Sequence, residues 1–115
     1  MAKTKQDQAA EKAVTDPEWR KPCDTLADVR AHIDRLDALI APLMAQRLHF
    51  VKTAARFKPS KEAVIVQARV EEIVQTVRRL AEQYGANPDV IERVYRTMID
   101  DFTLEEQKNW DKVHK

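Results

Sequence analysis

Several residue types are scarce in this chain of 115 residues, and each shortage excludes a class of protein. There is one glycine, and aromatic residues make up 6% of the chain, which fits a helical protein better than a sheet. Cys23 is the single cysteine, so neither an intrachain disulfide nor a cysteine cluster for zinc can form. No apolar run approaches 18 residues, so we expect no membrane span. The length predicts one domain.

Charge is abundant but balanced. Lys and Arg together number 20 and Asp and Glu number 19, giving a net charge of +1, which argues against an indiscriminate nucleic-acid binder. The N-terminus lacks the hydrophobic core of a secretory signal, so we expect a cytoplasmic location. The histidines have no metal-ligand spacing, and no metal site is expected.

An apolar stripe organises the segment from Asp24 to Lys58. Its positions alternate steps of three and four residues, as on one face of a helix: Leu26, Val29, Ile33, Leu36, Ile40 and Leu43. The next step reaches Arg47, after which the stripe is apolar again. A charge on the buried face of a helix is costly unless something pairs with it. We therefore interpret Arg47 as a residue that binds an anionic ligand.

Pro42 interrupts this segment without changing its phase, so we expect a kinked helix and not a break. A helix of 35 residues is about 50 Å long at ~1.5 Å per residue. A compact domain of this size has a radius of gyration of only ~13–14 Å. One chain cannot wrap both ends of such a rod, which predicts an intertwined homodimer.

The remaining chain predicts two more helices, for an all-α fold of three helices in residues 24–115. Residues 1–23 are polar and predict a disordered N-terminal extension. A linker from residue 59 leads to a second helix ending near Tyr84, Gly85 stops it, and Asn87 and Pro88 start the third. Two stripes mark the buried faces: Val66, Val70, Ile73, Val77, Leu80 and Tyr84, then Ile91, Tyr95, Met98, Phe102, Glu106 and Trp110.

Arg47 and Lys58 lie three turns apart, on nearly the same side of the first helix. Their Cα atoms would be ~16 Å apart, and two extended side chains leave a gap that a small dianion can bridge. Arg30 points elsewhere but could enter a neighbour's site in a dimer. A lone arginine on such a helix more often snorkels or pairs at the surface. Spacing alone leaves open a dianion-binding enzyme or a non-catalytic helical dimerisation module.

Five segments together resemble the all-helical class of chorismate mutases, and especially the isochorismate-pyruvate lyases of salicylate biosynthesis. They are LADVRAHIDRLD (26–37), QRLHFVKTAARFK (46–58), the single Arg69 after a linker, the Gly85 turn, and EEQKNW (105–110). The resemblance covers about residues 24–112. It implies a homodimer with two active sites, each completed by an arginine from the other subunit.

The resemblance also implies a role for each polar residue. Arg30 is the arginine from the partner subunit, and Arg47 clamps a substrate carboxylate. Lys58 binds the second carboxylate side and the ether oxygen, while Arg69 adds a carboxylate contact from the linker. Glu106 stands where the family usually has Gln, and sometimes Glu, bonded to the ether oxygen from the opposite side. Lys58 and Glu106 are therefore the predicted catalytic residues.

Three flanking positions depart from the mutases. Val66 and Val70 replace acids near the Arg69 position, as in the lyases, and Phe102 replaces a serine. We therefore expect a cofactor-free pericyclic reaction on a small dicarboxylate, with chorismate to prephenate first and isochorismate to salicylate and pyruvate as the alternative. Because only a protonated carboxyl can donate to an ether oxygen, Glu106 predicts mutase activity that rises below neutral pH.

Overall fold

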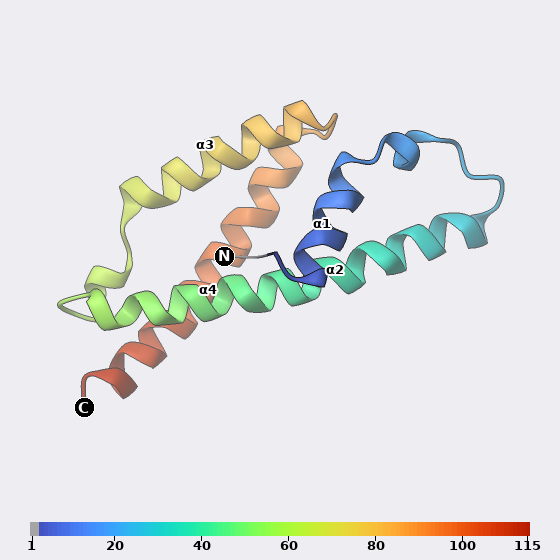
Figure 1. Cartoon of the computed structure of the whole chain (residues 1–115). Coiled ribbons are helices and arrows are strands. Elements are labelled where there is room, and N and C mark those ends of the chain that lie inside the picture. The colour runs from blue at the N-terminus through green and yellow to red at the C-terminus, as the bar shows by residue number, and fades with distance from the viewer. Residues whose placement is uncertain (1–2) are drawn as a thin grey trace. The chain divides into compact units, whose positions relative to one another are not determined.

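The computed structural model describes residues 3–115, except for the side chain of Gln6, and the regular secondary structure of the described part is entirely helical (Figure 1). It contains four α-helices: α1 (Lys5–Thr15), α2 (Leu26–Ala54), α3 (Gln67–Gln83) and α4 (Pro88–Val113). Three short 3₁₀ helices lie between them: η1 (Pro17–Arg20), η2 (Ala55–Phe57) and η3 (Glu62–Val64). The all-α prediction is confirmed, but the count of three helices is wrong because it omits α1. None of these helices has the length and apolarity needed to cross a bilayer.

The chain divides into two compact units, one up to Arg47 and one from Leu48 onward. In the first unit, α1 begins with a capping box. The Thr4 hydroxyl accepts from the Asp7 N–H at 3.0 Å, and the Asp7 carboxylate accepts from the Thr4 N–H at 3.1 Å. This pair satisfies helix N–H groups that would otherwise lack partners, so a helix forms in a polar segment with no strong apolar stripe. The domain boundary at residue 24 stays a prediction.

Helix α2 continues without interruption through Pro42, so the alternative of a break there is wrong. Its start is capped by Thr25, whose hydroxyl accepts from the Asp28 N–H at 3.0 Å. Its end comes at Ala54, earlier than the predicted Lys58, because the chain tightens into η2 before Pro59. The predicted apolar stripe of α2 is exposed at these positions: Leu26, Val29, Ile33, Leu36, Ile40 and Leu43.

In the second unit, a tight turn reverses the chain between α3 and α4, as the sequence predicts (Figure 1). Gly85 has a φ of 77°, the left-handed conformation that favours glycine. The Ala86 N–H donates to the Ala81 carbonyl at 2.8 Å and closes the end of α3. Asn87 then caps α4 by accepting from the Asp89 N–H at 2.9 Å, and Pro88 is the first helical residue.

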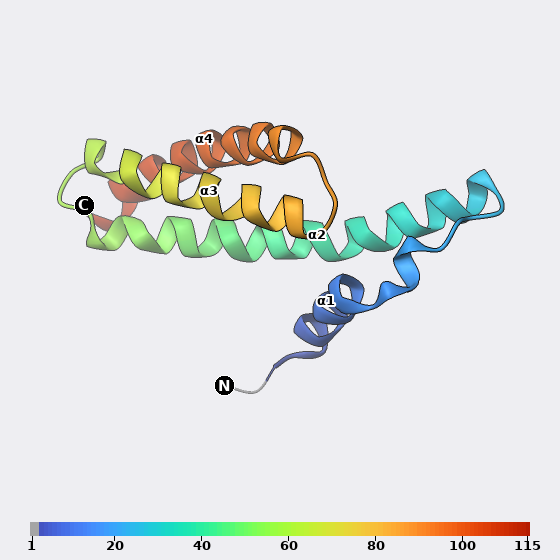
Figure 2. The ribbon, with the colours of Figure 1, turned by 90° about the horizontal axis from the view of Figure 1, so that it is seen from above.

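The core of this unit lies where α3 packs on α4 (Figure 2). Val74, Val77 and Ala81 are buried on α3, and Ile99 is buried on α4. The predicted stripe of α3 is only partly right, because Leu80 is 46% exposed whereas Val74 is fully buried. The buried face of α3 is therefore rotated about the helix axis from the predicted face, and it contains Val74, Val77 and Ala81.

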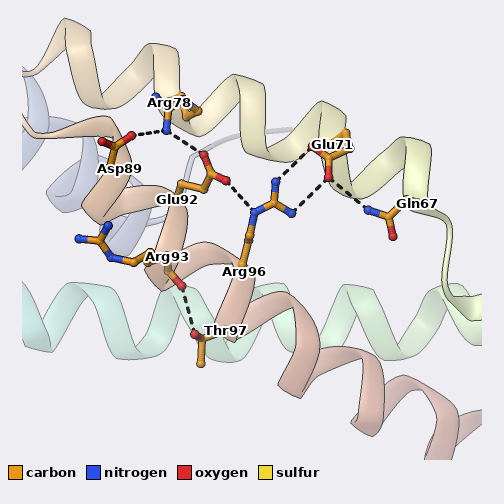
Figure 3. Close-up of polar contacts among 8 residues, drawn as sticks. All are labelled: Gln67, Glu71, Arg78, Asp89, Glu92, Arg93, Arg96 and Thr97. Atoms are coloured by element: carbon orange, nitrogen blue, oxygen red, sulfur yellow. Dashed lines mark hydrogen bonds and ion pairs between the residues drawn. The ribbon is translucent and has the colours of Figure 1, made fainter.

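An ion-pair network also joins α3 to α4 (Figure 3). The guanidinium of Arg96 on α4 contacts both carboxylate oxygens of Glu71 on α3 at 3.2 Å, and its Nε contacts Glu92 at 2.7 Å. Arg78 on α3 reaches Glu92 at 2.8 Å and Asp89 at 2.9 Å. These contacts place acids of each helix against a cation of the other, so they favour one register of α3 along α4.

Candidate functional site

Lys58 follows η2 at the point where the chain turns away from α2. Its backbone is extended, with φ −98° and ψ 135°, as expected for a residue that precedes proline. The 3₁₀ turn before it packs against α4 through Ala55, whose side chain is completely buried. A small residue at this position allows the close approach of η2 to α4, and that approach brings Lys58 to α4.

Glu106 faces Lys58 from α4. Its side chain is buried, at 5% exposure for the residue, and its Oε2 lies 3.6 Å from the Lys58 Nζ. At this distance the two groups form an ion pair, but they are too far apart for a good hydrogen bond. Oε2 has no hydrogen-bond partner among the described residues. The structure therefore brings together the two predicted catalytic residues, and leaves one buried carboxylate oxygen able to bind a further group.

Two opposing effects act on the pKa of Glu106. Burial in the helix interface raises the pKa, because the charged form loses its hydration. The ammonium group of Lys58 lowers it, but burial is the larger effect and the pKa lies above its ordinary value. A larger fraction of Glu106 is therefore protonated near neutral pH than for an exposed glutamate, and a protonated carboxyl can donate a hydrogen bond.

Two side chains of α4 that were not predicted to belong to the site hold the segment around Lys58. The indole Nε1 of Trp110 donates to the Lys58 carbonyl at 2.9 Å. The Asn109 amide donates to the Lys52 carbonyl at 2.8 Å. The sequence pattern places Trp110 only on the apolar face of its helix. A signal that could have found it is that a partly buried tryptophan usually has an acceptor for its N–H.

The predicted arginines lie in different surroundings. Arg69 is in the first turn of α3, where its exposed side chain forms an ion pair with Glu72 and not with Glu106. Arg30 is exposed on α2, and Arg47 is half-buried on the same helix. Both belong to the first compact unit, whereas Lys58 and Glu106 belong to the second. The substrate-binding roles of the three arginines stay predictions.

The three flanking positions belong to the start of α3 and the middle of α4. Val66 is the residue before α3 and is exposed, whereas Val70 in its first turn is half-buried. Phe102, one turn before Glu106, is also half-buried. The site thus consists of a buried acid and a partly exposed ammonium group. This pair can donate hydrogen bonds to a developing negative charge, and needs no nucleophile for that task.

Comparisons with known proteins agree with these features. The family model described as chorismate mutase type II matches residues 29–107. The chain is also 34% identical over 88 residues to a protein of Pseudomonas aeruginosa named isochorismate pyruvate lyase. That similarity covers 76% of this chain and 87% of the relative.

Proposed function

Because the chain belongs to the type II chorismate mutase family, we propose that it rearranges chorismate to prephenate in a single pericyclic step. The observation that carries this proposal is the buried Glu106 facing Lys58 at 3.6 Å. Substrate and product are isomers, so the reaction requires no co-reactant. The protein contributes by holding the substrate in a reactive conformation and by stabilising charge on the breaking C–O bond.

Each residue of the pair has a distinct role in this proposal. The ammonium of Lys58 donates to the ether oxygen as negative charge develops there. The protonated carboxyl of Glu106 donates to the same oxygen from the other side. Because both groups are partly removed from water, their electrostatic effect on the transition state is larger than it would be in solution. Arg47 and Arg69 bind the substrate carboxylates, for which a guanidinium group offers two parallel donors.

A second reaction, the cleavage of isochorismate to salicylate and pyruvate, is favoured by two observations. The Pseudomonas aeruginosa relative carries the name of that activity and matches most of the chain. Val66 and Val70 are apolar, where the mutases that the sequence resembles carry acids. The same pair of donors serves this reaction, since it also breaks the C–O bond of an enolpyruvyl ether.

We further propose that the active form is a homodimer in which Arg30 enters the partner's site. The exposed apolar stripe on α2 supports this proposal, since a row of large apolar side chains from Leu26 to Leu43 is unfavourable in water. The same stripe on a second copy of the chain could bury these side chains in a self-complementary interface. The competing interpretation is a helical dimerisation module without catalysis.

The deciding experiment offers chorismate and isochorismate separately to the purified protein, and follows prephenate and salicylate. Formation of prephenate supports the mutase, and formation of salicylate supports the lyase. If neither product forms, both enzymatic proposals are contradicted. The Arg47→Ala variant separates the enzyme from the module: for an enzyme, chorismate raises the melting temperature of the wild type more than that of the variant, whereas for a module this dicarboxylate raises the melting temperature of neither.

A further inference from the structure

The last turns of α4 hold the segment that carries Lys58 at three successive points. Three consecutive side chains make the contacts: Asn109 with the Lys52 carbonyl at 2.8 Å, Trp110 with the Lys58 carbonyl at 2.9 Å, and Asp111 with the Lys61 ammonium at 2.9 Å. The central contact is the one made to the lysine of the site.

Lys58 is thereby held at both of its ends by residues four positions apart on one helix. Residues at this spacing lie one above the other on the same face. The indole N–H of Trp110 donates a hydrogen bond to the backbone carbonyl of Lys58, and the carboxylate of Glu106 lies 3.6 Å from the Lys58 ammonium group. One contact therefore fixes the backbone position of Lys58, and the other fixes the position of its ammonium group.

No regular helix holds the Lys58 carbonyl, because η2 has already ended and Pro59 follows. The bond from Trp110 therefore replaces a main-chain partner. The indole plane is itself supported by the His114 ring, which stacks on it with ring centroids 4.2 Å apart. A four-carbon side chain such as that of Lys58 has many rotamers, so a defined backbone anchor narrows the positions its ammonium can reach.

We propose that Trp110 is a positioning residue whose indole N–H anchors the Lys58 backbone and so keeps the ammonium group directed at Glu106. The consequence for catalysis rests on the proposed function, because Lys58 acts on substrate only there. The consequence for the Lys58–Glu106 pair does not depend on any activity.

The test uses Trp110→Phe, which removes the N–H donor and keeps an aromatic ring. The matched control is Trp19→Phe, since Trp19 is 47% exposed and lies in the other compact unit. We expect kcat for prephenate or salicylate formation to fall about threefold to tenfold in Trp110→Phe, the range that one hydrogen bond supports, with KM changed less than about twofold. The comparison is made at about pH 5, at the acidic end of the profile, so that a change in the protonation of Glu106 affects kcat least. The control keeps the wild-type values.

A second readout follows the Glu106 carboxyl by NMR titration, with Glu106→Gln identifying the signal. Among the described residues, the ammonium of Lys58 lies 3.6 Å from Glu106, while Lys61 on the same segment is paired with Asp111. We expect the Glu106 pKa to rise further in Trp110→Phe, because an unanchored ammonium stabilises the carboxylate less. A merely structural role lowers the melting temperature and leaves this titration unchanged.

The inference is overturned if Trp110→Phe matches Trp19→Phe in both kcat and the Glu106 titration, or if only its melting temperature changes. Should Trp110→Phe fail to fold, His114→Ala decides. Loss of the stacked ring is expected to raise the Glu106 pKa, by less than the rise expected for Trp110→Phe. An unchanged Glu106 titration in His114→Ala overturns the inference. If the wild-type protein is inactive on both substrates, only the proposed function is contradicted. The Glu106 titration does not depend on activity and still tests the role of Trp110.

Discussion

At the scale of single residues, Glu106 combines burial with an ionisable group. Its carboxylate is nearly inaccessible, and the attraction of Lys58 does not compensate for the lost hydration. A glutamine would fill the same space without this pH dependence. The chemical difference between the two side chains is therefore a proton that Glu106 holds at low pH and releases at high pH.

We predict that Glu106→Gln flattens the pH profile of the enzyme. In the wild type, the protonated carboxyl is the donor, so kcat/KM is expected to rise as pH falls below neutral, by up to about tenfold per pH unit above the Glu106 pKa. The amide of glutamine donates at every pH. The measurement is kcat/KM between pH 5 and 8, with Glu105→Gln as the neighbouring control. A wild-type rate that is independent of pH in this range would contradict the assignment.

The same substitution changes thermal stability in a pH-dependent way. The pKa of Glu106 is raised in the folded protein, so its contribution to stability is fully present below the unfolded pKa and is lost as pH rises through the folded pKa. Glu106→Gln is therefore expected to raise the melting temperature relative to wild type at pH 8 and to change it less at pH 4. Thermal melts at both pH values make the comparison, and a larger gain at pH 4 would show that the pKa shift has the opposite direction.

At the scale of elements, the turn between α3 and α4 depends on one backbone conformation. Gly85 occupies φ 77°, and a side chain there costs about 1–2 kcal/mol of the free energy of unfolding. We predict that Gly85→Ala lowers stability by that amount, measured by urea unfolding. Gly85→Asn is the matched comparison, because asparagine tolerates the left-handed region better and should lose less. Equal losses in the two variants would point to another cause.

The Arg96 network is expected to make the α3–α4 pairing sensitive to acid. Hydrogen bonds from Arg96 hold the pKa values of Glu71 and Glu92 below their ordinary range, so the stability they contribute is present above the unfolded pKa and is lost as pH falls through the folded pKa. Arg96→Met should lower the melting temperature at pH 7 by a few degrees and have less effect near pH 3. Arg79→Met, an exposed arginine on α3, serves as control and should change little at either pH.

Local chemistry made much of the second unit predictable. Gly85, Asn87 and Pro88 specify where one helix stops and the next begins, whatever lies around them. The buried face of α3 was less predictable, because Val74 and Leu80 are both apolar and only the packing of α4 decides between them. Helix α1 was missed because its cue is a polar capping pair, Thr4 and Asp7, and not an apolar stripe.

The site was predictable to a similar degree. Glu106 is recognisable because an acid interrupts an apolar stripe, and Lys58 because it ends the amphipathic segment at a set spacing from Arg47. The bonds from Asn109 and Trp110 leave no such trace. Their acceptors are main-chain carbonyls, which every residue has, so no residue type marks them in the sequence.

At the scale of the whole molecule, the proposed shared active site makes a prediction about mixtures. Arg30→Ala and Lys58→Met should each abolish most activity, because each removes a cation from every site. If Arg30 serves the partner's site, a hybrid of one chain of each variant contains one intact site and one doubly defective site. Unfolding and refolding an equimolar mixture should then restore about a quarter of wild-type activity, since half of the dimers are hybrids with one of two sites intact.

The control for this experiment is each variant refolded alone, which should stay inactive. If Arg30 instead served the site of its own chain, every site in the hybrid would lack one cation, and mixing would restore nothing. The melting temperature of each variant, measured alongside, shows that both chains fold and can exchange.

The chain has two tryptophans, and the structure puts them in contrasting surroundings. Trp19 is exposed beside the Arg20 guanidinium, whereas Trp110 is half-buried and bonded to the carbonyl of Lys58. With Trp19 replaced by Phe, the tryptophan emission of the chain, excited selectively over its two tyrosines, comes from a single indole bonded to the lysine of the site. The arrival of an anionic ligand at that lysine can then be followed optically, without a label and in real time.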